Sequence, residues 1–242
     1  MTPEDAVRGA AGPVGRLGGA WMFDEGTNAR GAELGLSTWA WYHCGRGGVL
    51  GDADADVVVA AFGFFPPALQ RKAWDRGRAV LPVQQVAAAY AQACADWGGR
   101  TFADMPGAGR LADLLQQVVD AVEPAGIPVF AGWRALARTV ATDDPGRLAL
   151  ALQVLREHRG GLHLVAVVAQ GVAPLQAVMS GRYGAANARF FNWPEPWPDP
   201  EAGRAAMAAA EARTDALVLP AYAAIDEAGR AELVAALRAL PR

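Results

Sequence analysis

Apolar side chains recur along most of this chain at the three- and four-residue spacing that places them on one face of a helix. The clearest stripe runs over residues 111–122, and similar stripes run over 83–94, 148–155 and 226–240. Strict alternation of apolar and polar residues, the pattern of a half-buried strand, is scarce. We therefore predict an all-α protein, a multi-helix single domain of roughly ten helices.

Three of these helices begin at residues that favour a helix start. Thr2 precedes Pro3 and two acidic residues, which places a capping hydroxyl, a first-turn proline and negative charge at the positive end of a helix. Asp144 and Pro145 repeat that order before the next stripe, and Asp226 precedes the last one. We expect helices to begin at these three places.

Three segments depart from the amphipathic pattern. VVVAAF (57–62) and LHLVAVV (162–168) are β-branched enough for strands, but their neighbours are helical and no paired turn residues flank them. We therefore predict that both are buried helices. The stretch 190–200 carries four prolines and two tryptophans, which predicts an ordered loop. Such a loop serves as a lid over a pocket, as an anchor for a partner chain or as a rigid connector, and the sequence does not decide among these three roles.

A short polar motif occurs twice in the chain. YHCGRGG (42–48) is followed by an apolar run that ends in proline, and so is REHRGGLH (156–163). All three histidines of the sequence lie in or beside the two copies. We predict a duplicated core, with copies at about 36–75 and 148–180 that meet at a pseudo-two-fold axis. The alternative is chance similarity in a sequence rich in alanine, glycine and valine.

Composition limits the classes of protein to consider. The net charge is −3 and no basic block exists, so we expect no nucleic-acid partner. Two cysteines form no disulfide framework, and the N-terminus lacks a signal-peptide pattern. No apolar run reaches the length of a membrane span. We expect a cytoplasmic protein with reduced thiols and no membrane contact.

Several kinds of reactive site find no support in the spacing of residues. His158 and His163 are five residues apart, whereas two ligands on one helix favour three or four, and no zinc-type set of cysteines and histidines exists. We also expect Gly160 and Gly161 to bend the chain between the two histidines. Cys44 and His43 are neighbours that point about 100° apart on a helix, which favours a buried structural cysteine. The glycine pairs lack the spacing of a phosphate-binding loop. We expect neither a metal nor a cofactor.

We predict a polar pocket where the two copies of the motif meet. Charged groups on apolar helices are costly unless paired, so these charges either line a functional pocket or fix helix crossings as ion pairs. Arginine offers a planar fork for an anion, and histidine or a carboxylate takes a proton near neutral pH. We assign catalysis to Glu157, His158, His43 and Asp52, and substrate binding to Arg46, Arg159, His163, Trp41 and Trp193.

Residues 41–69, 155–169 and 211–237 resemble a family of uncharacterised actinobacterial proteins described as helix-turn-helix-like. The resemblance implies a winged-helix part after the second copy, and a C-terminal helix similar to those of MarR-type regulators. The chain departs from this pattern between Met179 and Glu211, where the Trp/Pro-rich loop replaces a recognition helix and a wing.

The division of the chain follows from the repeats and from this departure. We expect a helical domain over 1–180 that holds both repeats. The loop and the C-terminal helices over 181–242 then form a degenerate winged-helix-like region.

Two functions remain as hypotheses. The first is a cofactor-independent enzyme of natural-product biosynthesis that acts on a small anionic or amine substrate. The concrete reaction is displacement of a sulfate-type group by an amine of the same molecule, as in the enzymes that close aziridine rings in azinomycin-type pathways; the chain shares no motif with those enzymes. The second is a ligand-binding regulator derived from a helix-turn-helix protein, or a non-catalytic partner subunit. Trp193 and Trp197 suit a protein partner, either another copy or a different chain, because tryptophan is favoured in interface hot spots.

Overall fold

The computed structural model describes residues 1–240, which form thirteen α-helices and three short 3-10 helices without a strand. This confirms the predicted all-α fold, with more helices than expected. The α-helices are α1 (Pro3–Ala20), α2 (Glu25–Glu33), α3 (Thr38–Gly47), α4 (Ala55–Phe62), α5 (Pro67–Arg78), α6 (Val83–Thr101), α7 (Ala108–Asp120), α8 (Pro128–Ala137), α9 (Asp144–Ala169), α10 (Pro174–Ser180), α11 (Gly184–Phe190), α12 (Arg204–Ala223) and α13 (Glu227–Ala239). The 3-10 helices are η1 (Trp21–Phe23), η2 (Gly48–Leu50) and η3 (Pro200–Gly203).

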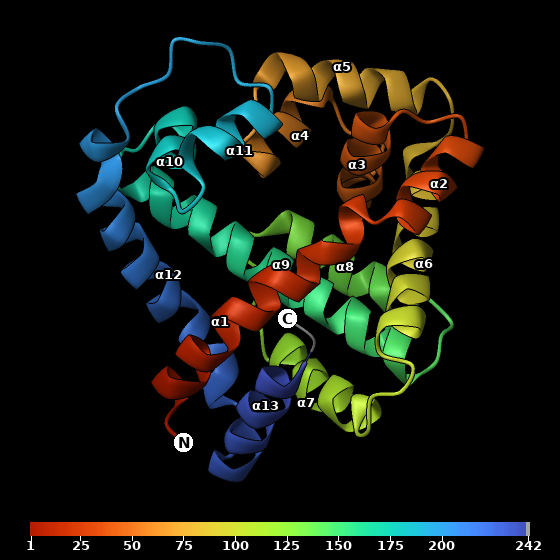
Figure 1. The fold of residues 1–242 in the computed structure, drawn as a ribbon, viewed down its shortest axis with the longest axis vertical. Coiled ribbons are helices and arrows are strands. Elements are labelled where there is room, and N and C mark those ends of the chain that lie inside the picture. Colours follow the sequence, from red (N-terminus) through yellow and green to blue (C-terminus); the bar gives the residue numbers. More distant parts are fainter. Residues whose placement is uncertain (241–242) are drawn as a thin grey trace.

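Helix α9 runs through the centre of the molecule and organises the rest (Figure 1). It has 26 residues, begins at the Asp143 cap and contacts α1, α6, α7, α8 and α12. Every residue from Leu148 to Leu155 is buried, and all of them but Gln153 are apolar, as expected of a helix surrounded by others. The polar residues Gln153 and Glu157 are nevertheless buried in its middle. The site described below is built around them.

The predicted helix starts are confirmed. Thr2 caps α1 through its side chain, with Pro3 in the first turn. Asp226 caps α13 in the same way, through the backbone N–H of Gly229. Helix α9 begins where expected, with Pro145 in its first turn, although its cap is Asp143 and not Asp144.

Glycines allow two helices to approach α9 closely. A Cβ on Gly18 of α1 would lie 2.6 Å from the carbonyl oxygen of Leu152. A Cβ on Gly98 of α6 would lie 2.6 Å from the carbonyl oxygen of Pro145 and 2.5 Å from the Cβ of Ala149. Backbone atoms cannot move aside without shifting a whole helix. These two glycines therefore set the distance of α1 and α6 from the central helix.

The two copies of the repeated motif adopt different backbones. In the first, α3 ends at Gly47, and η2, a turn at Gly51 (φ +77°) and the Asp54 cap precede α4. The second lies wholly inside α9. Both apolar runs are helical, as predicted, but the predicted burial is wrong for most of their residues. Only Val58 and Phe62 of the first run and Ala166 and Val167 of the second are buried. The expected bend at Gly160 and Gly161 is wrong, because the surrounding helices support an unbroken α9 through that pair.

The Trp/Pro-rich segment is an ordered loop, as predicted. It leaves α11 at Phe190 and extends as the long excursion before η3 (Figure 1). The Trp193 indole donates to the carbonyl of Phe64 at 3.1 Å, and the Trp197 indole donates to the carbonyl of Trp193 at 3.1 Å. Both indole donors are thus used within the chain. The Trp193 bond holds the loop against the segment that follows α4, whereas the Trp197 bond lies within the loop.

No single helix within residues 1–240 is long and apolar enough to cross a membrane. The pair α9 and α10 reaches the required composition together, but the two helices meet at a bend of 110°.

The close approach of α6 to α9 predicts the effect of adding one methyl group. Gly98→Ala should lower the free energy of unfolding by about 1–3 kcal/mol, because the new Cβ overlaps backbone atoms of α9. The neighbouring Gly99 has open space around its Cβ position and is the matched control. Gly99→Ala should be neutral or stabilise by up to about 1 kcal/mol, since alanine favours helix over glycine. Urea unfolding of both variants tests this packing, and equal stabilities would contradict it.

Candidate functional site

A buried ion pair joins the two copies of the repeated motif. Arg46 of α3 donates from Nε to Oε1 of Glu157 at 2.8 Å, and from Nη2 to Oε2 at 2.8 Å. The Glu157 side chain is 1% exposed and that of Arg46 is 11% exposed. Two parallel hydrogen bonds between planar groups are the strongest arrangement such a pair can adopt. The pair therefore fixes α3 against the middle of α9.

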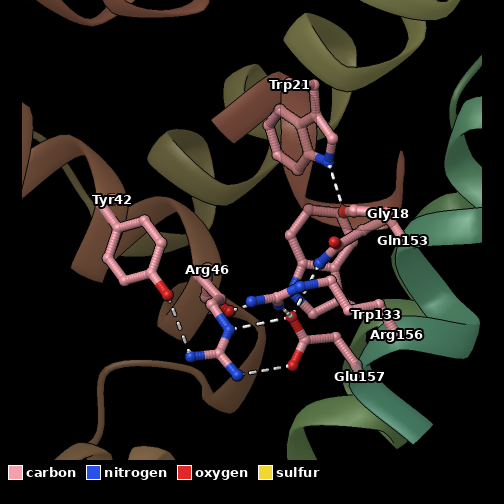
Figure 2. Close-up of polar contacts among 8 residues, drawn as sticks. All are labelled: Gly18, Trp21, Tyr42, Arg46, Trp133, Gln153, Arg156 and Glu157. Atoms are coloured by element: carbon pink, nitrogen blue, oxygen red, sulfur yellow. Dashed lines mark hydrogen bonds and ion pairs between the residues drawn. The ribbon is translucent and has the colours of Figure 1, made fainter. Parts of the chain in front are cut away.

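Further polar side chains complete this cluster (Figure 2). Gln153 donates to Oε1 of Glu157 at 2.8 Å, and Arg156 donates to the same oxygen at 3.2 Å. Arg46 also donates from Nη1 to the hydroxyl of Tyr42 at 3.3 Å. These five residues, which we call the arginine cluster, come from α3 and α9 alone.

The arginine cluster holds more positive than negative charge. Two guanidinium groups, those of Arg46 and Arg156, share the one carboxylate of Glu157. Burial alone would raise the pKa of Glu157, but the charge and hydrogen bonds of Arg46 hold it below its ordinary value. Glu157 thus stays ionised and accepts four hydrogen bonds, which leaves it a poor proton acceptor. The catalytic role that the sequence suggested for Glu157 is not favoured by this geometry.

All residues of the arginine cluster except Gln153 line a cavity of about 1470 Å³. Typical ligand pockets measure about 300–1,000 Å³, so this one has room for a large molecule. Its lining is mainly apolar, and its aromatic members are Phe23, Tyr42, Phe62, Phe64, Phe65, Phe130, Phe190, Phe191 and Trp193. Eight large apolar side chains are exposed in the described residues, and five of them line this cavity: Phe23, Val57, Val165, Val168 and Phe190. The cavity therefore concentrates the accessible apolar surface of the protein.

The glycine pair of the second motif copy shapes the cavity wall. A Cβ on Gly160 would meet no atom within 4 Å, although this residue lines the cavity. A Cβ on Gly161 would lie 2.7 Å from the Cγ2 of Ile127, which precedes α8. Gly161 thus lets the segment before α8 approach α9, and Gly160 leaves space open. In the first copy, by contrast, Gly45, Gly47 and Gly48 face side chains or backbone of neighbouring elements.

A second polar group lies on the cavity wall between α9 and α12. Arg159 donates to Glu211 at 2.9 Å and to Asp215 at 2.8 Å. His163 contacts Glu211 and the hydroxyl of Thr214 through Nδ1. Hydrogen bonding by His163 is the main cause that lowers the pKa of Glu211, to about 2, with Arg159 adding to it. Arg159 and His163 are therefore tied to α12 and not to the arginine cluster.

Five of the nine predicted site residues line this single cavity. They are Arg46, Glu157, Arg159, His163 and Trp193. Asp52 does not, because it forms an exposed ion pair with Arg78. Trp41 does not either, because its ring is buried against Tyr90 and the backbone of Gly31.

His43 and His158 also lie outside the cavity lining. His43 is buried among aromatic rings and bonds the carbonyl of Trp39 at 2.9 Å, while His158 packs on Phe130. Burial lowers the pKa of each to about 4, so both are neutral at pH 7. The predicted catalytic roles of His43, His158 and Asp52 are thus not supported by position.

Five polar residues that line the cavity were not among the predicted site residues: Tyr42, Asp56, Arg156, Asn187 and Glu211. Tyr42 lies one turn before Arg46, and Arg156 adjoins Glu157, so both stood inside the repeated motif. Glu211 comes from α12, and nothing local to it indicated a site. Among residues 1–240, no group of three or more His, Cys, Asp or Glu is placed to hold a metal ion.

The buried neutral histidines predict a loss of stability in mild acid. The unfolded chain takes a proton at His158 near the ordinary pKa of 6.5, whereas the folded chain does so only near 4. Lowering the pH from 7 to 5 therefore protonates the unfolded state selectively, and costs about 2 kcal/mol for each such histidine. In His158→Phe, the difference in unfolding free energy between pH 7 and pH 5 should shrink by that amount. Urea titrations at both pH values measure it, with Arg8→Met as a surface control; an unchanged difference would refute the assignment.

Residues 7–201 match the model of a helix-turn-helix family. No curated protein and no solved structure matches the chain. The family match confirms the helix-turn-helix part of the resemblance carried by the sequence segments. Because it spans well over half of the sequence, the chain belongs to this helix-turn-helix family.

Proposed function

We propose that this protein binds a bulky, mainly apolar small molecule in the cavity, and that Arg46 and Arg156 hold an anionic group of that molecule. The observation that carries the proposal is the pair of guanidinium groups that share one carboxylate at the wall of a large apolar cavity. An anionic group there balances the surplus charge. The apolar walls contribute affinity through burial, and the few polar groups fix the orientation of the ligand.

The arginine donors are available for such a contact. Arg46 uses one N–H on Nε, one on Nη1 and one on Nη2, which leaves two of its five. Arg156 bonds the arginine cluster only through Nη1, and its side chain is 29% exposed. The surrounding carboxylate and hydroxyl hold Arg46 in place before a ligand arrives, which reduces the entropy lost on binding.

Ligand binding accords with the regulator hypothesis drawn from the sequence. Membership of a helix-turn-helix family is compatible with a regulator whose response depends on a bound small molecule. The net charge of −3 argues against strong contact with nucleic acid by this chain alone. We therefore propose that ligand binding to this chain is passed on to a protein partner, which carries the regulatory response.

A matched pair of fluorescent probes tests the anion site. 8-Anilinonaphthalene-1-sulfonate carries a sulfonate on the scaffold of N-phenyl-1-naphthylamine, which has none. Arg156→Met should weaken binding of the sulfonate about tenfold, through loss of a charge-assisted contact, and change binding of the neutral probe less than about twofold. Fluorescence titration of folded protein, verified by circular dichroism, measures both affinities. Equal losses for the two probes would contradict the anion site.

A side chain added to the cavity wall tests the location of the binding site. Gly160→Leu places a side chain in the open space of the wall and should weaken binding of both probes. Gly99→Leu adds the same side chain on α6, outside the cavity, and should bind both like the wild type. Unaltered binding by Gly160→Leu would place the probes elsewhere and contradict the proposal.

A second candidate is the cofactor-independent enzyme that displaces a sulfate-type group by an amine. The observation that favours it is that the same guanidinium groups suit a departing anion, while His163 lies on the wall of the same cavity. A model substrate is the sulfate ester of phenylalaninol, in which the amine nitrogen attacks the carbon that bears the sulfate. The N–C bond forms as the C–O bond breaks and sulfate leaves, and the nitrogen passes a proton to His163, which gives 2-benzylaziridine. The protein should release inorganic sulfate faster than buffer does, and Arg156→Met should slow that release; a rate equal to that of buffer would count against the enzyme.

A further inference from the structure

His163 is the one histidine of the described chain that lines the cavity. Its Nδ1 lies 3.0 Å from the hydroxyl oxygen of Thr214 and 3.1 Å from Oε2 of Glu211. Both partners belong to α12, so two contacts across the helix pair fix one nitrogen of the ring. The protonation of that nitrogen decides what the other nitrogen offers.

The partners of Nδ1 require that it carries the proton. The Thr214 hydroxyl donates its only proton to the carbonyl of Ala210 at 2.7 Å, so its oxygen can only accept from His163. Glu211 is an ionised carboxylate and also only accepts. An unprotonated Nδ1 would face two oxygens without a shared proton, which is repulsive. In the neutral ring, Nε2 is consequently the nitrogen without a proton.

Nε2 of His163 is also accessible. No group among residues 1–240 forms a hydrogen bond with Nε2. Nε2 is also not one of the buried polar atoms that lack a partner, so it is open to the cavity. The side chain is 21% exposed, and the ring lies 5.9 Å from that of Phe64, another residue of the cavity wall. Arg159 holds Glu211 from its other oxygen, which keeps the arrangement rigid. Nε2 of His163 is thus a free hydrogen-bond acceptor on a mainly apolar wall.

We propose that His163 presents this unprotonated Nε2 to the cavity and accepts a hydrogen bond from a hydroxyl or amine group of the bound molecule. The inference rests on the proposed function, since it concerns the same cavity. It narrows the ligand to a bulky apolar compound that carries both an anionic group and an O–H or N–H donor. It also assigns the acceptor role to His163 in place of Glu157, whose carboxylate already accepts four hydrogen bonds.

The tautomer can be observed without any ligand. In protein labelled with ¹⁵N-histidine, long-range ¹H–¹⁵N correlation at about pH 8, above the ordinary pKa of histidine, separates protonated from unprotonated ring nitrogens. His163→Asn assigns the signals by loss. We expect a protonated Nδ1 and an unprotonated Nε2 for His163. A proton on Nε2, on both nitrogens, or exchanging between them as in a free imidazole would overturn the proposal.

Ligand recognition is tested with 2-naphthol and with 2-methoxynaphthalene, in which a methyl group replaces the hydroxyl proton. Wild-type protein should bind 2-naphthol about fivefold more tightly, the contribution of one net hydrogen bond. His163→Asn retains a side-chain donor toward Thr214 and Glu211 but lacks Nε2, so it should bind the two probes equally. Thr214→Ser retains the hydroxyl, and with it the preference for 2-naphthol. Isothermal titration calorimetry provides the affinities.

The outcomes separate this inference from the proposed function. Equal affinity of wild-type protein for both naphthalenes, with the sulfonate probe still dependent on Arg156, would overturn the role of His163 alone. Failure of all probes to respond to Gly160→Leu would overturn the cavity as the binding site, and the ligand contact of His163 with it.

Discussion

The fold depends on one buried carboxylate, that of Glu157, in the middle of its central helix. An ionised group at that depth is tolerated only when charge and hydrogen bonds replace the water that it has lost. Arg46 supplies two of those bonds from α3, and Gln153 and Arg156 supply others from within α9. Trp133 of α8 in turn donates to the backbone carbonyl of Arg46 at 3.0 Å (Figure 2). These polar contacts thus fix the positions of α3, α8 and α9 relative to one another, which apolar packing alone would not do.

The same requirement creates the candidate site. A single carboxylate neutralises only one of the two guanidinium groups beside it, so the wall of an apolar cavity carries an unbalanced positive charge. On the other part of that wall, α12 provides acidic partners for Arg159 and His163. A cavity with a cationic group at one place and a hydrogen-bond acceptor at another selects ligands by chemistry, although most of its surface is apolar.

Local patterns in the sequence predicted the helices well, because caps, prolines and apolar stripes act over a few residues. They also indicated that Arg46 and the motif around Glu157 belong together. The predicted site residues that lie outside the cavity are those whose positions depend on long-range packing. Asp52 pairs with Arg78 at the surface, and His43 and His158 pack against aromatic rings in the interior.

The remaining part of the site was not predictable from local sequence. Gly160 and Gly161 do not bend α9, because neighbouring helices support it. They instead leave room in the cavity wall and allow the segment before α8 to approach α9. Glu211 became part of the cavity through the docking of α12, 48 residues beyond His163 in the sequence. The duplication itself remains a prediction, because the two copies adopt different backbones.

A double-mutant cycle on Arg46 and Glu157 tests the central claim most directly. Glu157→Leu and Arg46→Met, measured singly by urea unfolding at pH 7, should each lower the free energy of unfolding by about 3–5 kcal/mol, because each leaves buried charge without its partner. The double variant should lose at least about 2 kcal/mol less than the sum of the two. Two single losses below about 1 kcal/mol that simply add would contradict the account, because the buried pair would then not hold the central helix in place.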